Sequence, residues 1–131
     1  MREIKFRGIP TYGKDFVYGS LIININEAGR KEYLIKKHIG IIEVIPETVG
    51  QYAGLKDKNG VEIYEGDIIK AIWSKDCKEY IANEIWIGDI FFNCGSFDIN
   101  SEWCVALNCF NGALEVIGNI YENKELLNEN K

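Results

Sequence analysis

Apolar and polar positions alternate in short segments along most of the chain, and glycine, proline and asparagine separate these segments. Residues 2–8 alternate with a period of two, which predicts a short strand. Residues 16–25 are β-branched and aromatic, and Gly19 within them indicates a bulge or a close backbone approach. Residues 79–87 fit a strand and a short helix equally well. Further strands are expected at residues 31–36, 39–45, 48–52, 68–73, 90–92, 97–99, 103–107 and 114–121.

The stretch from residue 46 to residue 71 holds the strongest turn signals. We expect a turn at 54–55, a type I turn at 57–60 between the strands of a hairpin, and a sharp corner at 65–67. Asp57 and Asp67 in these turns are predicted to accept hydrogen bonds from backbone N–H groups. The less favoured alternative is a catalytic carboxylate, for which neither has a visible partner. The predicted structural turn motif consists of Gly50, Gly54, Asn59, Gly60, Gly66 and Asp67, of which all but the aspartate readily adopt positive φ.

This pattern predicts a mainly β protein built from short antiparallel strands and hairpins. Turn signals every 8–12 residues are typical of a sandwich or small barrel, and we expect an SH3-like small barrel in the C-terminal half. Asn123 is a candidate N-cap for a short C-terminal helical turn. The whole chain, residues 1–131, is expected to be a single domain, within which residues 1–45 and 46–131 can form sub-lobes.

The composition of the chain limits the classes of partner that it is expected to bind. The net charge of -5, from 15 basic and 20 acidic residues, disfavours non-specific binding to nucleic acid. The chain contains no apolar run of the roughly 20 residues that a membrane helix needs, and its start has no signal-peptide pattern. We therefore expect a cytoplasmic protein without a membrane partner, in which the four cysteines stay reduced.

Candidate chemistry is sparse. The cysteines are 17, 10 and 5 residues apart and His38 is the only histidine, so neither a zinc site nor a Cys–His nucleophilic pair is indicated, and no cofactor is expected. A small hydrolase would need such a pair, or two carboxylates, to converge in a pocket. The tryptophans and the Phe91–Phe92 pair are better explained as core and interface anchors than as a base-stacking platform. The residues concerned are Cys77, Cys94, Cys104, Cys109, Trp73, Trp86 and Trp103.

Two apolar strands near the N-terminus can pair between chains. Residues 2–7 and 16–25 would add to the sheet of a neighbouring copy if their edges were unpaired, because an open strand edge is a template for docking. The charged side chains of Glu3, Lys5 and Arg7 would protect such an edge in the alternative case. A homo-oligomer is the expectation.

Six pieces of the chain, in the same order, resemble the YopX family of bacteriophage and prophage proteins. The pieces at the centre and near the end are the most specific. This resemblance implies a small, phage-encoded, β-rich protein without a recognised catalytic set, acting in a bacterial host. The pieces are Ile4-Lys-Phe-Arg7, Val17-Tyr-Gly-Ser-Leu21, Pro46-Glu-Thr-Val-Gly-Gln-Tyr52, Gly54-Leu-Lys-Asp-Lys-Asn-Gly60, Glu62-Ile-Tyr-Glu-Gly-Asp-Ile-Ile-Lys70 and Glu115-Val-Ile-Gly-Asn-Ile-Tyr-Glu-Asn123.

From residues and resemblance together, we expect a non-enzymatic phage or prophage accessory protein. It would act by protein binding or homo-oligomeric assembly, with an unidentified phage or host protein as a further partner. The alternative is a nucleic-acid-binding module that uses the surface of an SH3-like barrel.

Overall fold

The computed structural model describes residues 3–73, 84–93, 95–100, 104–106 and 114–127. The protein is mainly β, and its strands are antiparallel. In these ranges its only helical elements are 3-10 turns, which confirms the predicted fold class. It divides into two units, residues 1–54 and 55–131. Residues 46–54 belong to the first unit, where Gly50 and Gln51 pair with its first strand.

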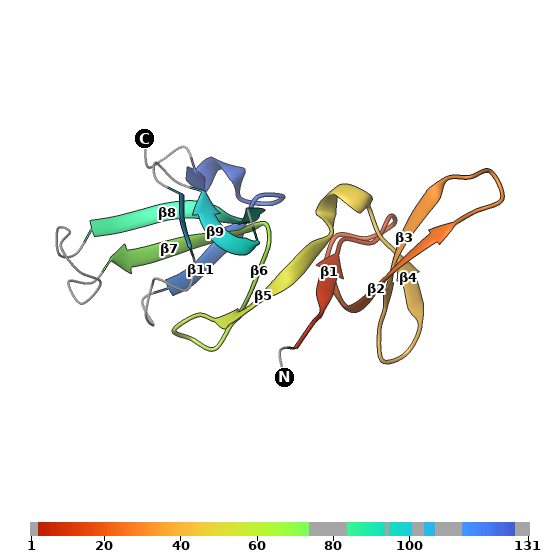
Figure 1. Ribbon diagram of the computed structural model, residues 1–131, viewed down its shortest axis with the longest axis horizontal. Coiled ribbons are helices and arrows are strands. Elements are labelled where there is room, and N and C mark those ends of the chain that lie inside the picture. Colours follow the sequence, from red (N-terminus) through yellow and green to blue (C-terminus); the bar gives the residue numbers. More distant parts are fainter. Residues whose placement is uncertain (1–2, 74–83, 94, 101–103, 107–113, 128–131) are drawn as a thin grey trace. The chain divides into compact units, whose positions relative to one another are not determined.

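Unit 1 contains a sheet in the order β4-β3-β2-β1-β5 (Figure 1). β5 continues past the division, and its neighbour beyond the division is β6. Of the strand predicted at 48–52, residues 50–52 are confirmed as part of β5, whereas Thr48 ends a 3-10 turn that begins at Pro46. The predicted turn at 54–55 is wrong, because β5 continues through Gly54, whose φ is +87°. The elements are β1 (Phe6–Gly8), β2 (Val17–Ile25), β3 (Lys31–Lys36), β4 (Ile41–Glu43), η1 (Pro46–Thr48) and β5 (Gly50–Lys56).

The sheet of unit 1 curls back on itself beyond β4. The N–H of Ile45 donates to the carbonyl of Ile9 at 2.8 Å, and the N–H of Thr11 donates to that of Glu43 at 3.2 Å. The Thr48 hydroxyl accepts the N–H of Ile9 at 2.9 Å and donates to the carbonyl of Ile45 at 2.7 Å. These bonds close the small core of unit 1 around Ile35, Val44 and Tyr52, with the buried Arg7 guanidinium 4.0 Å from the ring centre of Phe16.

Unit 2 contains a five-stranded antiparallel sheet in the order β10-β9-β8-β7-β11 (Figure 1). Four strands follow one another as a meander, and β11 returns beside β7, so the sheet curls into a half-barrel. Buried isoleucines from β6, β7, β8 and β9 fill its core. The elements are β6 (Glu62–Tyr64), β7 (Asp67–Trp73), β8 (Glu84–Asn93), β9 (Ser96–Asn100), β10 (Cys104–Ala106), β11 (Leu114–Asn119) and η3 (Lys124–Leu127).

Glycines explain two further features of unit 2. Residues 84–87 of the segment predicted at 79–87 and the segment predicted at 90–92 belong to one strand, β8, whereas residues 79–83 lie outside the described residues. Gly88 joins the two parts, because it allows the carbonyl of Asn100 to approach where a Cβ would lie 2.5 Å from its oxygen. The register of β11 shifts between Val116 and Gly118, at the predicted bulge. The predicted C-terminal helical turn is present as η3. The Asn123 side-chain oxygen was expected to cap this turn, but it accepts the N–H of Asn119, which precedes the turn in sequence, at 3.2 Å.

Candidate functional site

Asp57 organises the hairpin turn between β5 and β6. One carboxylate oxygen accepts the N–H groups of Asn59 and Val61 at 2.8 and 2.9 Å, and the N–H of Gly60 donates to the Asp57 carbonyl at 3.0 Å. Gly60 has a φ of +83°, which a glycine adopts without strain. This is the turn and the acceptor role that the sequence predicts.

The second carboxylate oxygen of Asp57 reaches the closing strand of unit 2. It accepts the N–H of Val116 at 3.0 Å, and the N–H of Lys58 donates to the carbonyl of Leu114 at 2.9 Å. Burial raises the pKa of Asp57, but the hydrogen bonds from Val116, Val61 and Asn59 outweigh this, and the net pKa lies below its ordinary value. A carboxylate held in this way is a structural latch, with its oxygens occupied by the backbone.

The corner at Gly66 is built by a second buried aspartate. Asp67 accepts the N–H of Tyr64 at 2.8 Å. Gly66 itself, with φ +90°, donates its N–H to the carbonyl of Ile90 and accepts the N–H of Ile120, both at 2.9 Å. The corner therefore connects β8 with the end of β11. Gly50, the remaining glycine of the predicted motif, is an extended strand residue that pairs with Arg7.

A polar group on β8 and β9 was not predicted. Asp98 is buried and accepts the Ser96 hydroxyl at 2.7 Å and the Asn93 side-chain amide at 3.3 Å. Burial raises the pKa of the half-buried Asp89, against smaller opposing contributions from its own backbone N–H and from the Asn100 side chain. Polar and apolar residues alternate over residues 96–100, and this alternation could have revealed the polar group. Within the described ranges, no three His, Cys, Asp or Glu side chains gather as metal ligands.

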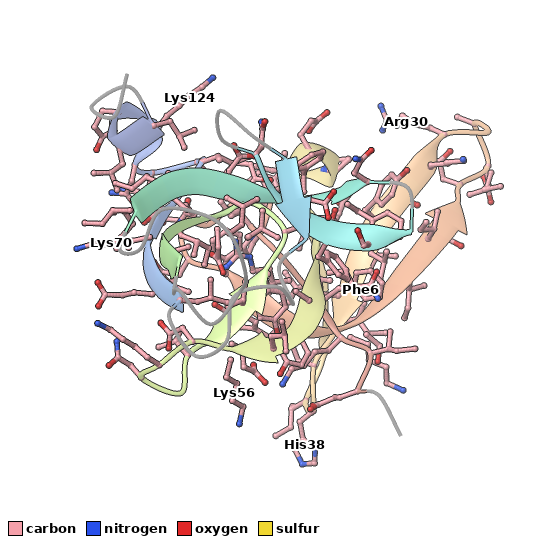
Figure 2. All side chains as sticks on the ribbon, turned by 60° about the vertical axis from the view of Figure 1, so that its left-hand side comes forward. Phe6, Arg30, His38, Lys56, Lys70 and Lys124 are labelled. Atoms are coloured by element: carbon pink, nitrogen blue, oxygen red, sulfur yellow. The ribbon has the colours of Figure 1, made fainter. Side chains whose placement is uncertain are left out.

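The sequence-predicted chemical groups do not form a site in the described part of the chain. Cys77, Cys94, Cys109 and Trp103 lie outside it, as do the side chains of Cys104, Trp73 and Trp86. His38 is exposed in the turn between β3 and β4; it and Arg30 lie beyond opposite ends of β3 (Figure 2). Phe92, expected to be an anchor, is 54% exposed and contacts Phe97 edge-to-face, with ring centres 5.1 Å apart.

The most distinctive surface of unit 1 is the outer half of the β2–β3 hairpin, residues 20–34, which we call the ribbon (Figure 1). β1 pairs with β2 only from Val17 to Gly19, and β4 pairs with β3 only from Leu34 to Lys36. Apart from Tyr33 and Leu34, which bond to Val44 and to β4, the ribbon therefore continues beyond its neighbours as two strands. At its tip, the Asn26 side-chain oxygen accepts the N–H groups of Ala28 and Arg30 at 3.0 and 2.9 Å.

Apolar side chains of the ribbon are exposed. Ile23 lies opposite Tyr33 and Ile25 opposite Lys31, on the same face of the hairpin as Leu21. Ile23 is 50% exposed and Ile25 is 65% exposed. Together with Leu21 on the same face, the two exposed isoleucines form a small apolar stripe on the ribbon.

The predicted docking edges need correction. Phe6 and Arg7 of the segment 2–7 pair with β2 on one side and with β5 on the other, so β1 is an inner strand. Of the segment 16–25, Val17 to Gly19 are likewise covered by β1. The residues from Ser20 onward, in the ribbon, retain an edge that no strand within residues 3–54 covers.

Comparisons with known proteins agree on the identity of the fold. A family model described as YopX protein matches residues 5–128. The crystal structure of protein EF1440 from Enterococcus faecalis is similar to this chain, with 26% sequence identity, a TM-score of 0.56, and coverage of 97% of this chain and 99% of that one. No curated protein matches the sequence. Among the described residues, no helix has the length and apolar character needed to cross a membrane.

Proposed function

This chain belongs to the YopX family, and from that membership we propose that it is a non-enzymatic accessory protein of a phage or prophage, acting in the bacterial cytoplasm by binding proteins. The ribbon is its binding surface. The partners include copies of the same chain and a phage or host protein. The observation that carries this proposal is the pair of exposed isoleucines, Ile23 and Ile25, on a two-stranded extension with an open edge.

The arrangement of carboxylates supports a binding role over catalysis. Asp57 and Asp67 accept backbone N–H groups, and Asp98 accepts neighbouring side-chain donors. The catalytic alternative requires an ionisable pair that faces a common substrate position. Asp57 and Asp67 are instead used by the turns that they build, and Asp98 by the polar group on β8 and β9.

Charge distribution bears on the nucleic-acid alternative. Residues 55–131 contain seven Lys and Arg against fourteen Asp and Glu, whereas residues 1–54 contain eight against six. An SH3-like surface on unit 2 would therefore repel a phosphate backbone. Titration of labelled single- and double-stranded DNA at low and at moderate salt checks this, and we expect no binding at either.

Affinity capture from an induced or infected host tests the binding role. We expect the wild-type chain to retain specific proteins, and the double variant Ile23→Lys/Ile25→Lys to lose them. Ile39→Lys is the matched control, because Ile39 is 84% exposed in the β3–β4 turn, outside the ribbon. Equal capture by all three chains, or no specific capture by any, would contradict the proposal.

A further inference from the structure

The open edge of the ribbon can be assigned to particular backbone groups. In an antiparallel strand, the N–H and C=O of one residue point to the same side, and successive residues alternate in side. The N–H of Asn26 donates to the carbonyl of Arg30, so the even-numbered residues of β2 face β3. The N–H and C=O groups of Leu21, Ile23 and Ile25 consequently face away from β3.

No strand within residues 3–54 pairs with β2 at these three positions. The pairing of β1 with β2 ends at Phe6 opposite Gly19. On its other side, the chain bonds to β5 one residue further toward the N-terminus, where the carbonyl of Lys5 accepts the N–H of Tyr52 at 2.9 Å. An edge of this kind offers three consecutive outward-facing residues to an incoming strand.

The charge pattern of this edge identifies the incoming strand. Residues 16–26 contain no charged side chain, between Asp15 and Glu27. Natural sheet edges are normally protected against pairing by charged residues, lysine above all. When two copies of one strand pair about a two-fold axis, like charges come close across that axis, which destabilises most sequences but not this one. By contrast, β3 carries Lys31, Glu32 and Lys36.

We propose that the chain forms a homodimer in which the ribbon edge of β2 pairs with the same edge of a second copy. The strands are antiparallel and the two-fold axis passes through Ile23. Leu21 then lies opposite Ile25 of the second copy, and each outward-facing pair exchanges two N–H···O bonds. This deepens the proposed function and rests on it, because it names the partner of the same surface.

This register covers the exposed apolar side chains. Leu21, Ile23 and Ile25 share one face, so each copy adds its three apolar side chains to a single stripe across the four-stranded sheet β3-β2-β2-β3. Strand pairing of this length buries less surface than a standard interface. We therefore expect weak association, with a dissociation constant of roughly micromolar or above.

Sedimentation velocity of the purified full-length chain from about 1 μM to about 1 mM tests the dimer. We expect the wild type and Ile39→Lys to pass from monomer to dimer over this range. Ile25→Lys brings two positive charges into the pairing and should weaken association at least tenfold. Ile23→Pro removes the outward-facing N–H at the axis but leaves the bonds between the even-numbered residues of β2 and β3. It should therefore also weaken association at least tenfold. Circular dichroism and thermal unfolding identify any variant that fails to fold.

Hydrogen exchange provides a second measurement that does not depend on a variant. The amides of Leu21, Ile23 and Ile25 should exchange more slowly as the concentration of the wild-type chain rises, whereas the exposed amide of Ile39 should not. A wild type that stays monomeric up to 1 mM, or dimers whose exchange at these three amides is independent of concentration, would overturn the self-pairing. Loss of captured partners in the Ile23→Lys/Ile25→Lys variant would in that case still support the binding function, so the two proposals fail separately.

Discussion

The two units of this protein treat backbone hydrogen-bonding groups in opposite ways. In unit 2, buried aspartates at Asp57 and Asp67 satisfy the N–H groups of turns, and Asp57 also holds the closing strand at Val116. In unit 1, the outer half of β2 leaves the backbone groups of Leu21, Ile23 and Ile25 without a neighbouring strand within residues 3–54. The first arrangement fixes a single shape, and the second leaves pairing capacity for another chain. In the proposed function, unit 2 therefore supplies rigidity and unit 1 supplies the surface for association.

The largest effect is expected when the Asp57 carboxylate is removed. Asp57→Ala leaves the N–H groups of Asn59, Val61 and Val116 without their acceptor, and we expect the free energy of unfolding to fall by about 3 kcal/mol. Urea-induced unfolding measures this loss. Lys58→Ala is the control, since its ion pair with Glu115 is exposed and worth less than about 1 kcal/mol. A loss for Asp57→Ala no larger than that of the control would show that the latch is unimportant.

The corner at Gly66 provides the second test of rigidity in unit 2. In Gly66→Ala, an alanine would have to adopt a φ of +90°, and its Cβ would lie 3.2 Å from the Tyr121 ring. We therefore expect the free energy of unfolding to fall by about 2 kcal/mol. Gly60→Ala meets the same unfavourable φ but has no atom within 4 Å of the new Cβ, and it should cost about 1 kcal/mol. Thermal unfolding of the two variants should therefore rank Gly66→Ala below Gly60→Ala, and the reverse order would contradict the packing argument.

Unit 2 should also show opposite pH effects from two of its aspartates. The pKa of Asp57 is lowered by folding, so its contribution is complete above the unfolded value of about 3.9 and is lost as the pH falls through the folded value. The stability difference between the wild type and Asp57→Asn should thus be constant near neutrality and shrink in acid.

Asp89 has a raised pKa, because burial disfavours its charge. Its charged form opposes folding above the folded pKa, so Asp89→Asn should stabilise the protein at pH 7 and lose this advantage as the pH falls from the raised folded pKa to the unfolded value of about 3.9. Urea unfolding at several pH values checks both aspartates. The same sign of pH dependence for both variants would be inconsistent with the structure.

The smallest effect on stability is expected in the ribbon of unit 1. Ile25 is already 65% exposed, so Ile25→Lys should change the free energy of unfolding of the monomer by less than about 0.5 kcal/mol. Ile35→Ala, on the same hairpin but fully buried, should cost about 3 kcal/mol. Unfolding at low protein concentration, where the monomer predominates, makes the comparison. A large loss for Ile25→Lys would mean that this part of the ribbon is structural.

The sequence revealed the local structure better than the relations between distant segments. The turn at 57–60 and the bulge at Gly118 were predicted because aspartate, asparagine and glycine act on their immediate neighbours. The bond from Val116 to Asp57 could not be predicted, since its partners are 59 residues apart and no spacing rule connects them. For the same reason, the sequence did not predict that β8 is one continuous strand. Gly88 indicates a break between strands, and only the contact with the carbonyl of the distant Asn100 explains why a glycine lies within the strand.

The candidate surface was predicted only in outline. An uncharged, β-branched segment at 16–25 indicated a strand that could dock, but which half of it stays open depends on the point at which β1 leaves β2. At that point β1 also pairs with β5, which brings together residues more than forty positions apart. Short segments predicted their own conformation, and the pairing of remote segments decided which of them are available to a partner.

The latch at Asp57 has a consequence for the order of events as the chain emerges from the ribosome. All strand partners from β1 to the first half of β5 lie within the first 54 residues, so unit 1 can assemble while unit 2 is still being translated. The Asp57 turn can form at once, but its second oxygen must wait for Val116. A nascent chain stalled before that residue would present a finished ribbon on an unfinished half-barrel, and self-recognition could then begin between neighbouring ribosomes on one message.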